Sequence, residues 1–228
     1  MEGQYTSLNV IDLGLIEYKE AYKIQQEVLQ NRRFGEVPDT LLLAEHPPVI
    51  TIGRSGSRKN VLIDEDTLKK KGVSIFEIDR GGDVTYHGPG QLVAYPIMHI
   101  KSLTDGDIHK FLRGLEDIII RFLSCYNITG NRIPHYTGVW VGDKKIASIG
   151  IGVRRWISYH GLALNINPDM SHFSMINPCG LAAAKMTSME ECLKRPVSIG
   201  EIKREFIESF KSIYSRCNGG LQTSIVEG

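Results

Sequence analysis

The sequence has almost no net charge. Its 228 residues include 27 Lys and Arg against 26 Asp and Glu, which gives a formal net charge of +1 at pH 7. Proteins that bind nucleic acid through its phosphates usually carry a marked excess of basic residues. The overall balance therefore gives no indication of nucleic-acid binding, and a charged partner would have to meet a local patch.

A long hydrophobic run and a paired-cysteine motif are also lacking. No apolar stretch approaches the roughly 20 residues that cross a bilayer, and the start, MEGQYTSLNV, does not resemble a signal peptide. The four cysteines, Cys125, Cys179, Cys192 and Cys217, form no C-x-x-C pair and have no zinc-site spacing with histidine. We expect no membrane segment, no metal, and the cytosol or an equivalent reducing compartment.

The composition is that of one globular domain. Hydrophobic residues make up 42% and charged residues 23% of the chain, and its length suffices for a substantial core. No repeat or linker divides the sequence. We expect a single domain over residues 1–217 and a disordered tail over residues 218–228.

Strand patterns outnumber helix patterns. Short apolar runs predict strands at residues 7–15, 40–53 (two strands), 73–79, 92–100, 138–153 (a hairpin) and 157–167. Helical periodicity covers residues 16–32 and 107–127, and a last helix begins at Ser198. Hairpins outnumber strand–helix alternations, so we predict an α+β fold with a mixed, largely antiparallel sheet flanked by helices. Pro96 indicates an edge strand or a bulge.

One segment, DRGGDVTYHGPGQ (residues 79–91), combines four glycines with Arg80, Thr85, Tyr86 and His87. Glycines let a backbone approach a ligand closely. The segment is neither a P-loop nor a dinucleotide fingerprint. It could be a tight hairpin with ordinary turn glycines, but Arg80 and His87 together favour a binding site.

Two further residues stand in unusual settings. Cys179 lies between Pro178 and Gly180 in MINPCGL, which favours a thiol presented on a turn, although a free cysteine is more often a small core residue. Lys145 begins the apolar run KIASIG, so its side chain could turn inward while Lys144 points to water. Burial would push a lysine pKa below its usual ~10.4, which suits proton transfer.

The remaining candidates have plainer interpretations. His46, in EHPP, is a turn or packing residue. Cys125 and Cys192 are expected to pack within helices, and Cys217 to be exposed. The basic runs at Arg58–Lys59, Lys69–Lys71 and Arg154–Arg155 are normally solvated faces.

Several stretches together resemble a known family. EHPPVITIGR, RGGDVTYHGPGQLVAYPI, GVWV, KIASIGI, YHGLALNIN and INPCGL occur in the order and approximate spacing of the octanoyltransferases, also called lipoate-protein ligase B. The resemblance covers roughly residues 8 to 215. It implies a fold akin to the catalytic domain of biotin and lipoate protein ligases.

The resemblance also implies an activity and its residues. Octanoyl would move from octanoyl-acyl carrier protein to a lysine on a lipoyl domain, without ATP or another cofactor. Cys179 matches the cysteine that carries the acyl thioester, and Lys145 matches the lysine paired with it. The matches to the substrate-contacting segments are Arg80, Gly81, Gly82, Asp83, Val84, Thr85, Tyr86, His87, Ser148, Ile149, Gly150, Gly161, Leu162 and Ala163.

These residue types suit the implied chemistry. A thiol is mostly protonated at neutral pH, and an ammonium held beside it would favour the thiolate. Lys145 would then protonate the departing thiol and later accept a proton from the incoming amine. Backbone N–H groups near Gly180 or in the glycine-rich segment could hold the oxyanion.

The implied partners are the acyl carrier as donor and, as acceptors, the lipoyl domains of 2-oxoacid dehydrogenase E2 subunits and the glycine cleavage H protein. Such carrier and lipoyl domains are typically acidic. We therefore expect basic groups to help dock them, and the candidates are Arg54, Arg58, Lys59, Arg154 and Arg155.

Three other functions fit parts of the sequence. An ATP-dependent lipoate or biotin ligase of the same fold would share the glycine-rich segment and the lysine, but would not need Cys179. A non-catalytic protein that binds acyl carriers or lipoyl domains would have no reason to keep both Lys145 and Cys179. An unrelated cysteine hydrolase would need a histidine near Cys179, and the nearest in sequence, His172, lies in an expected loop.

Overall fold

The computed structural model describes residues 8–177 and 186–217, with the side chains of residues 215–217 left aside. Two expectations therefore lie outside the described residues: the presentation of Cys179 on a turn and the tail at residues 218–228. The exposure of the Cys217 side chain is likewise outside them.

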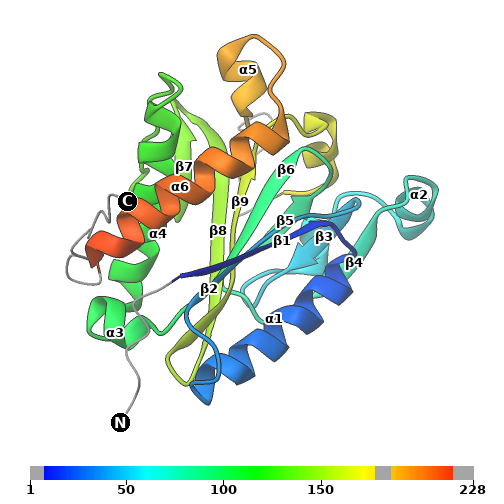
Figure 1. Ribbon diagram of the computed structural model, residues 1–228. Coiled ribbons are helices and arrows are strands. Elements are labelled where there is room, and N and C mark those ends of the chain that lie inside the picture. Colours follow the sequence, from blue (N-terminus) through cyan, green and yellow to red (C-terminus); the bar gives the residue numbers. More distant parts are fainter. Residues whose placement is uncertain (1–7, 178–185, 218–228) are drawn as a thin grey trace.

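Two sheets organise the described chain (Figure 1). The larger has the strand order β1-β2-β6-β9-β8-β7, and the smaller has the order β4-β3-β5. In the large sheet, only β1 and β2 pair in parallel. The strands are β1 (Asn9–Leu15), β2 (Thr40–Glu45), β3 (Val49–Ile52), β4 (Ser74–Glu77), β5 (Val84–His87), β6 (Gln91–Ile97), β7 (Gly138–Val141), β8 (Lys144–Arg154) and β9 (Ile157–Asn165).

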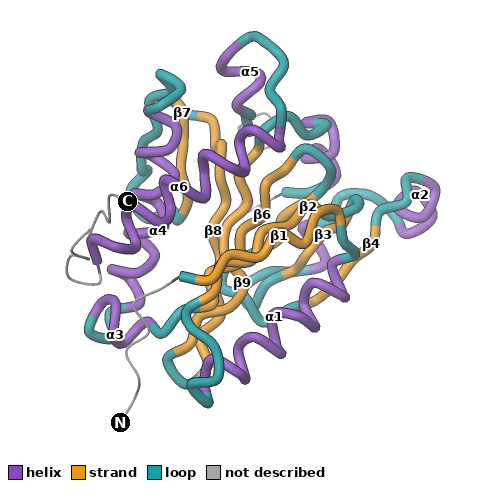
Figure 2. The backbone as a smooth tube through the Cα atoms, viewed as in Figure 1, coloured by secondary structure: helices purple, strands orange, loops and turns teal. Residues whose placement is uncertain are grey.

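Helices cover both faces of the large sheet (Figure 2). Side chains alternate along a strand, so Leu41 and Leu43 of β2 pack on one face and Leu42 and Ala44 on the other. Helices α4 (Ile108–Ser124) and α6 (Ile199–Cys217) cover the first face, and α1 (Tyr18–Arg33) covers the second. The shorter helices are α2 (Glu65–Lys70), α3 (Ile100–Thr104), α5 (Met189–Leu193) and the 3₁₀ segments η1 (Arg58–Asn60) and η2 (Met170–Met175).

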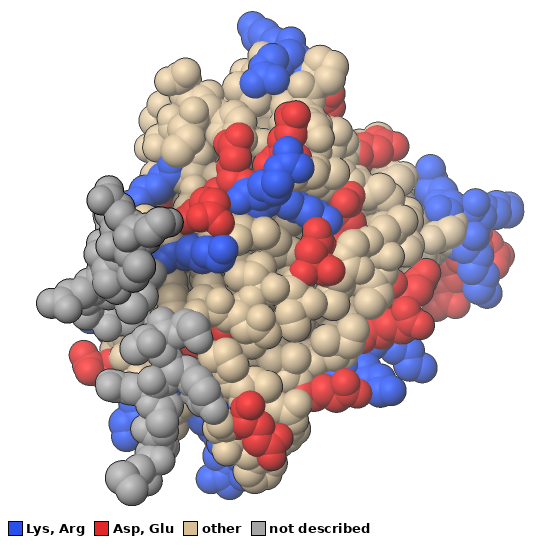
Figure 3. All heavy atoms as spheres, in the orientation of Figure 1, with Lys and Arg blue, Asp and Glu red and all other residues tan. Residues whose placement is uncertain are grey.

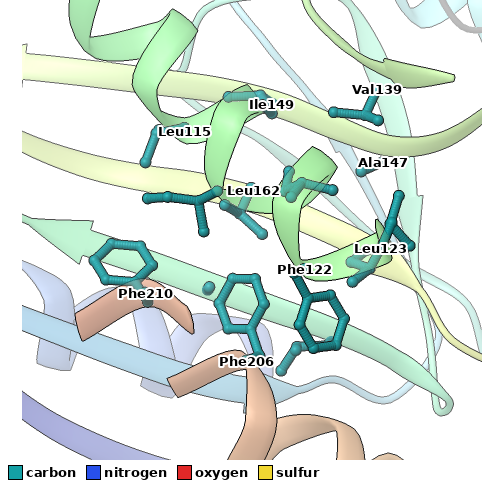
Figure 4. Packing of buried hydrophobic residues seen from close by; sticks show 14 of the residues in the cluster. Leu115, Phe122, Leu123, Val139, Ala147, Ile149, Leu162, Phe206 and Phe210 are labelled. Carbon is teal, nitrogen blue, oxygen red and sulfur yellow. The ribbon is translucent and has the colours of Figure 1, made fainter. Parts of the chain in front are cut away.

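The larger core lies under α4 and α6 (Figure 4). Phe122 of α4 and Phe206 of α6 meet edge to face, with ring centroids 5.5 Å apart. Their helices repeat apolar residues at intervals of three and four, which places one stripe against the sheet. This packing covers one face of β8 and β9, and part of their opposite face borders the functional site.

The predicted fold class is confirmed, and so are the predicted strands and the three long helices. Strand β5 is the main addition: the glycine-rich segment contains a strand that pairs with β3. Its sequence, VTYH, is too short to stand out among the surrounding glycines.

Pro96 lies in an interior strand, so the edge-strand alternative is wrong. Strand β6 is paired with β2 and β9, but the regular pairing with β9 ends at Ala94 and Leu162. Beyond that point the Ser158 hydroxyl donates to the carbonyl of Pro96 at 2.6 Å. A proline is tolerated in this interior strand because the ladder is irregular there.

The packing predictions for cysteine were half right. Cys192 lies in α5 and packs against the core, as expected. The burial of Cys125 was wrong, because α4 ends at Ser124 and Cys125 is exposed. The chain returns to the core through Ile128 instead.

The surface carries both signs of charge. In the view of Figure 3, acidic and basic side chains alternate without a large area of one sign. No helix in the described part of the chain has the length and apolar character needed to cross a membrane.

Candidate active site

A cavity of about 740 Å³ lies between the small sheet and strands β6, β8 and β9 of the large sheet. Lys145 lines it, together with thirteen of the fourteen residues expected to contact substrate. The exception is Tyr86, whose hydroxyl hydrogen-bonds Nδ1 of His172 at 2.6 Å and whose ring packs on Phe173. Since side chains alternate along β5, Thr85 and His87 lie on the cavity side while Tyr86 faces η2.

Small residues leave open the volume of the cavity. The lining that β8 and β9 contribute includes the small residues Ser148, Gly150, Gly161 and Ala163. The backbone N–H of Gly81 donates to the carbonyl of Ile151 at 2.8 Å, which holds the glycine-rich loop against β8. A Cβ on Gly150 would lie 2.5 Å from the carbonyl oxygen of Gly81, so a side chain there would push the loop away.

Arg80 fastens this loop to the small sheet. It is buried, and its Nη2 donates to the carbonyl of Thr51 at 2.9 Å while Nη1 donates to the carbonyl of Gly81 at 3.0 Å. A guanidinium can satisfy several acceptors at fixed angles. Arg80 therefore shapes the cavity wall as well as lining it.

Lys145 enters the cavity from the second position of β8. The residue is only 8% exposed, whereas Lys144 is exposed, as the sequence predicted. The Nζ atom lies 5.0 Å from the centroid of the buried Trp140 ring, within the range of a cation–π contact. Gly138 leaves room for this side chain, since an added Cβ there would be 2.6 Å from Cε of Lys145.

A buried carboxylate fixes the start of β7 beside this lysine. Glu116 of α4 is fully buried; its Oε1 accepts from the N–H of Gly138 at 3.0 Å, and its Oε2 accepts from Arg113 and Arg132 at 2.7 Å each. Two guanidinium groups and one N–H compensate the buried charge. Glu116 thus fixes the position of Gly138, and Gly138 in turn leaves the space that the Lys145 side chain occupies.

The backbone of Lys145 also pairs with the segment that follows the NPCG stretch. Met186 forms a parallel bridge with Lys145, and the N–H of Thr187 donates to the carbonyl of Lys145 at 2.9 Å. On the other side of residues 178–185, the N–H of Asn177 donates to the carbonyl of Asn60 at 2.8 Å. Met186 also lines the cavity.

The sequence did not single out the pair formed by Asp79 and His160. His160 lies near the start of β9 and lines the cavity. His160 Nε2 lies 2.9 Å from Asp79 Oδ1, and the Tyr159 hydroxyl donates to Asp79 Oδ2 at 2.5 Å. Burial lowers the pKa of His160 to about 4 against the opposing pull of Asp79, so this histidine is neutral at physiological pH. Its φ of 55° is unusual for a residue other than glycine.

His172, the nearest histidine to Cys179 in sequence, lies in η2 rather than in a plain loop, and it bonds Tyr86. His46 is fully buried between Ile16 and Tyr95, which confirms its packing role. Within the described ranges, no three His, Cys, Asp or Glu side chains gather as metal ligands would.

The expected docking residues differ in setting. Arg54 lines the cavity and Arg155 is exposed at the β8–β9 turn. Arg154 donates to Gln26 at 3.1 Å and lies 3.6 Å from Asp79. Arg58 pairs with Glu65 at 3.2 Å, an exposed contact worth little.

Comparison with known proteins decides the family. Residues 17–211 match the model of the lipoyl protein ligase A/B catalytic domain. An octanoyltransferase from Rubrobacter xylanophilus is 45% identical over 216 residues, which is 93% of this chain and 96% of that protein. The chain belongs to the octanoyltransferase family. It is an acyltransferase, as the resemblance implied.

Solved structures support the fold. A bipartite lipoate protein ligase from Thermoplasma acidophilum superposes with a TM-score of 0.73 at 16% identity, covering 92% of this octanoyltransferase and 84% of that chain. The biotin protein ligase of Aquifex aeolicus, solved with biotin and ATP, gives 0.54 at 13% identity, covering 91% and 71%. At these identities the likeness concerns the fold alone.

Proposed function

We propose that this octanoyltransferase moves an octanoyl group from octanoyl-acyl carrier protein to a specific lysine of a lipoyl domain, through a thioester on Cys179. The observation that carries this proposal is Lys145: a lysine only 8% exposed, on the wall of a large cavity, in the family's KIASIG context. Its backbone is paired with Met186, seven residues after Cys179 in the sequence.

The first half-reaction loads the enzyme. The Cys179 thiolate attacks the carbonyl carbon of the donor thioester, a C–S bond to Cys179 forms, and the C–S bond to the carrier breaks. The carrier sulfur leaves with a proton from the Lys145 ammonium. One thioester replaces another, so the step needs no ATP.

The second half-reaction delivers the acyl group. The neutral amine of the acceptor lysine attacks the Cys179 thioester, a C–N bond forms and the C–S bond breaks. The excess proton on nitrogen passes to the Lys145 amine, which restores the thiolate and ammonium. The amide product is far less reactive than the thioester, which makes the transfer one-way.

The cavity suits this substrate. Its volume lies within the ~300–1,000 Å³ of typical small-ligand sites. Apolar lining from Val84, Val93, Ile149, Leu162 and Ala163 offers a wall for an eight-carbon chain. Tyr86 is the one proposed contact that would act indirectly, by fixing β5 from behind through His172.

The acceptors we propose are the lipoyl domains of 2-oxoacid dehydrogenase E2 subunits and the glycine cleavage H protein. A neighbour of the same fold was solved as a lipoylation system with an E2 lipoyl domain. We place the reaction in the cytosol, since the free thiols of Cys125 and Cys192 suit a reducing compartment.

An ATP-free transfer assay separates this function from that of a ligase. The protein is incubated with octanoyl-acyl carrier protein and a lipoyl domain, and the lipoyl domain is weighed by mass spectrometry. We expect it to gain one octanoyl group without ATP. Modification that requires ATP and free octanoate would contradict the proposal and favour a ligase.

A further inference from the structure

The side chain of His87 is held in one tautomer by a chain of hydrogen bonds that runs through the large sheet. His87 Nδ1 lies 2.7 Å from Gln91 Oε1, and Gln91 Nε2 lies 2.9 Å from Asn165 Oδ1. Asn165 Nδ2 then lies 2.9 Å from the carbonyl oxygen of Thr187. At the end of this chain, the N–H of Thr187 donates a hydrogen bond to the carbonyl of Lys145.

Backbone carbonyls fix the direction of this chain. The carbonyl of Thr187 can only accept, so the amide NH₂ of Asn165 points at it and the Asn165 oxygen must accept from Gln91. Gln91 Nε2 also donates to the carbonyl of Tyr86 at 3.2 Å. The Gln91 oxygen therefore accepts, and His87 Nδ1 must carry the proton.

The other ring nitrogen, Nε2, is then a lone-pair acceptor. His87 lines the cavity, and burial lowers its pKa to about 3, so the ring stays neutral. His46 has the same tautomer, because Nδ1 donates to the carbonyl of Ile16 at 2.7 Å, but its Nε2 already accepts from the Tyr95 hydroxyl at 2.6 Å. No group among the described residues donates to Nε2 of His87.

We propose that Nε2 of His87 accepts a hydrogen bond from the attacking amine of the acceptor lysine and so orients its lone pair toward the thioester. This assignment rests on the transfer reaction proposed above. A neutral primary amine has two N–H groups, and one is directed to Lys145 for proton transfer. The other needs an acceptor once the amine has left water.

A neutral acceptor is the right choice for this role. A carboxylate in its place would favour the ammonium form of the incoming lysine, which has no lone pair to attack with. The reacting groups of the loading step do not need such an acceptor: a thioester has no N–H or O–H, and a thiolate would be repelled by a lone pair. His87, which also lines the acyl cavity, should therefore matter more for the second half-reaction than for the first.

Two substitutions distinguish the roles of the two ring nitrogens of His87. In His87→Asn the side-chain NH₂ takes the place of Nδ1–H and can still donate to Gln91, but nothing replaces Nε2. In His87→Gln the terminal amide reaches the place of Nε2, where its oxygen can accept. Acyl loading is followed by intact mass after mixing with octanoyl-acyl carrier protein, and discharge is followed after adding a lipoyl domain.

We expect His87→Asn to discharge about 10- to 100-fold more slowly than the wild type and to lose much less of its loading rate. His87→Gln should recover part of the discharge rate. The assignment would be overturned if His87→Asn discharged at the wild-type rate, or if its loading slowed as much as its discharge. Either result would leave the proposed transfer reaction unaffected. Absence of an acyl adduct in the wild type would instead overturn the transfer reaction, and this assignment with it.

A measurement on the wild-type protein does not depend on how the variants fold. Nitrogen NMR of ¹⁵N-histidine-labelled protein reports which ring nitrogen carries the proton. We expect His87 to show a protonated Nδ1 and an unprotonated Nε2 in the free enzyme. The opposite tautomer, with the proton on Nε2, would overturn the assignment.

Discussion

At the scale of single residues, the site depends on side chains buried beside partners that are distant in the sequence. The inward turn of Lys145 could be predicted from the apolar run that follows it. The Asp79–His160 pair could not, because its members are 81 residues apart and nothing in their local sequence indicates that they meet. The strand pattern GVWV likewise does not indicate that the Trp140 ring lies beside the Lys145 ammonium.

Replacing Trp140 tests that contact. In Trp140→Leu the ammonium form of Lys145 loses the face of the ring, an interaction worth about 0.5–2 kcal/mol. We expect octanoyl transfer to slow roughly 10-fold and the alkaline limb of the pH–rate profile to move to lower pH. Trp140→Phe, which keeps an aromatic face, is the matched control. Its transfer rate should lie between those of the wild type and Trp140→Leu. A loss of rate without movement of the pH profile would indicate packing damage only.

At the scale of elements, helices and strands were predictable where a long stretch of sequence repeats its apolar residues regularly. The prediction failed where the chain is irregular. Helix α4 repeats its apolar residues over 17 positions, and β8 and β9 are long apolar strands. Strand β5 has only four residues among glycines, and its place in a second sheet depends on pairing with β3. Such pairing is a tertiary contact that local propensity does not encode.

The start of β7 is the element whose geometry we expect to matter most for Lys145. In Gly138→Ala the new methyl group would meet Cε of Lys145 at 2.6 Å and the carbonyl of Ala147 at 2.5 Å. We expect at least a 10-fold loss of transfer rate, because the lysine must move aside. The measurement is the steady-state transfer rate, with thermal melting recorded beside it.

Gly142 provides the control for this substitution. It also has a positive φ, but a Cβ there would meet nothing within 4 Å. Gly142→Ala should cost about 1 kcal/mol of stability through backbone strain and leave transfer per folded molecule unchanged. Equal losses of activity in the two variants would mean that strain, not displacement of Lys145, is responsible.

At the scale of the whole molecule, three histidines are buried in the neutral form. Burial lowers the pKa of His46, lowers that of His87 to about 3 and lowers that of His160 to about 4. Below pH ~6.5 the unfolded chain takes up protons at these positions and the folded chain does not. Acid therefore favours unfolding.

We expect the free energy of unfolding to fall as the pH drops from 6.5 toward 4, by up to about 1.4 kcal/mol per pH unit for each histidine. Urea unfolding at pH 7.5, 6.0 and 5.0 measures this slope. His46→Gln should make the slope shallower, because one of the three buried neutral histidines is then absent. An unchanged slope in His46→Gln would contradict the predicted burial effect.

Docking of an acidic carrier is also a property of the whole surface. Arg155 is exposed in the β8–β9 turn, two residues after the cavity-lining Val153, whereas Lys211 lies on α6, beyond the opposite face of the large sheet. Arg155→Glu should raise the KM for octanoyl-acyl carrier protein several-fold at low salt and weaken its salt dependence. Lys211→Glu makes the same change of charge and should leave the KM unaltered. An equal rise in KM in both variants would mean that the net charge of the protein, and not the position of Arg155, causes the effect.

The central claim is that Cys179 carries the octanoyl group, and intact mass tests it most directly. Wild type, Cys179→Ser and Lys145→Ala are each incubated with octanoyl-acyl carrier protein without ATP or acceptor, and then weighed before and after hydroxylamine. We predict one octanoyl adduct on the wild type, removed by hydroxylamine, no thioester on Cys179→Ser and slow loading of Lys145→Ala. A wild-type protein that gains no mass, or a hydroxylamine-sensitive adduct that persists in Cys179→Ser, would contradict the account.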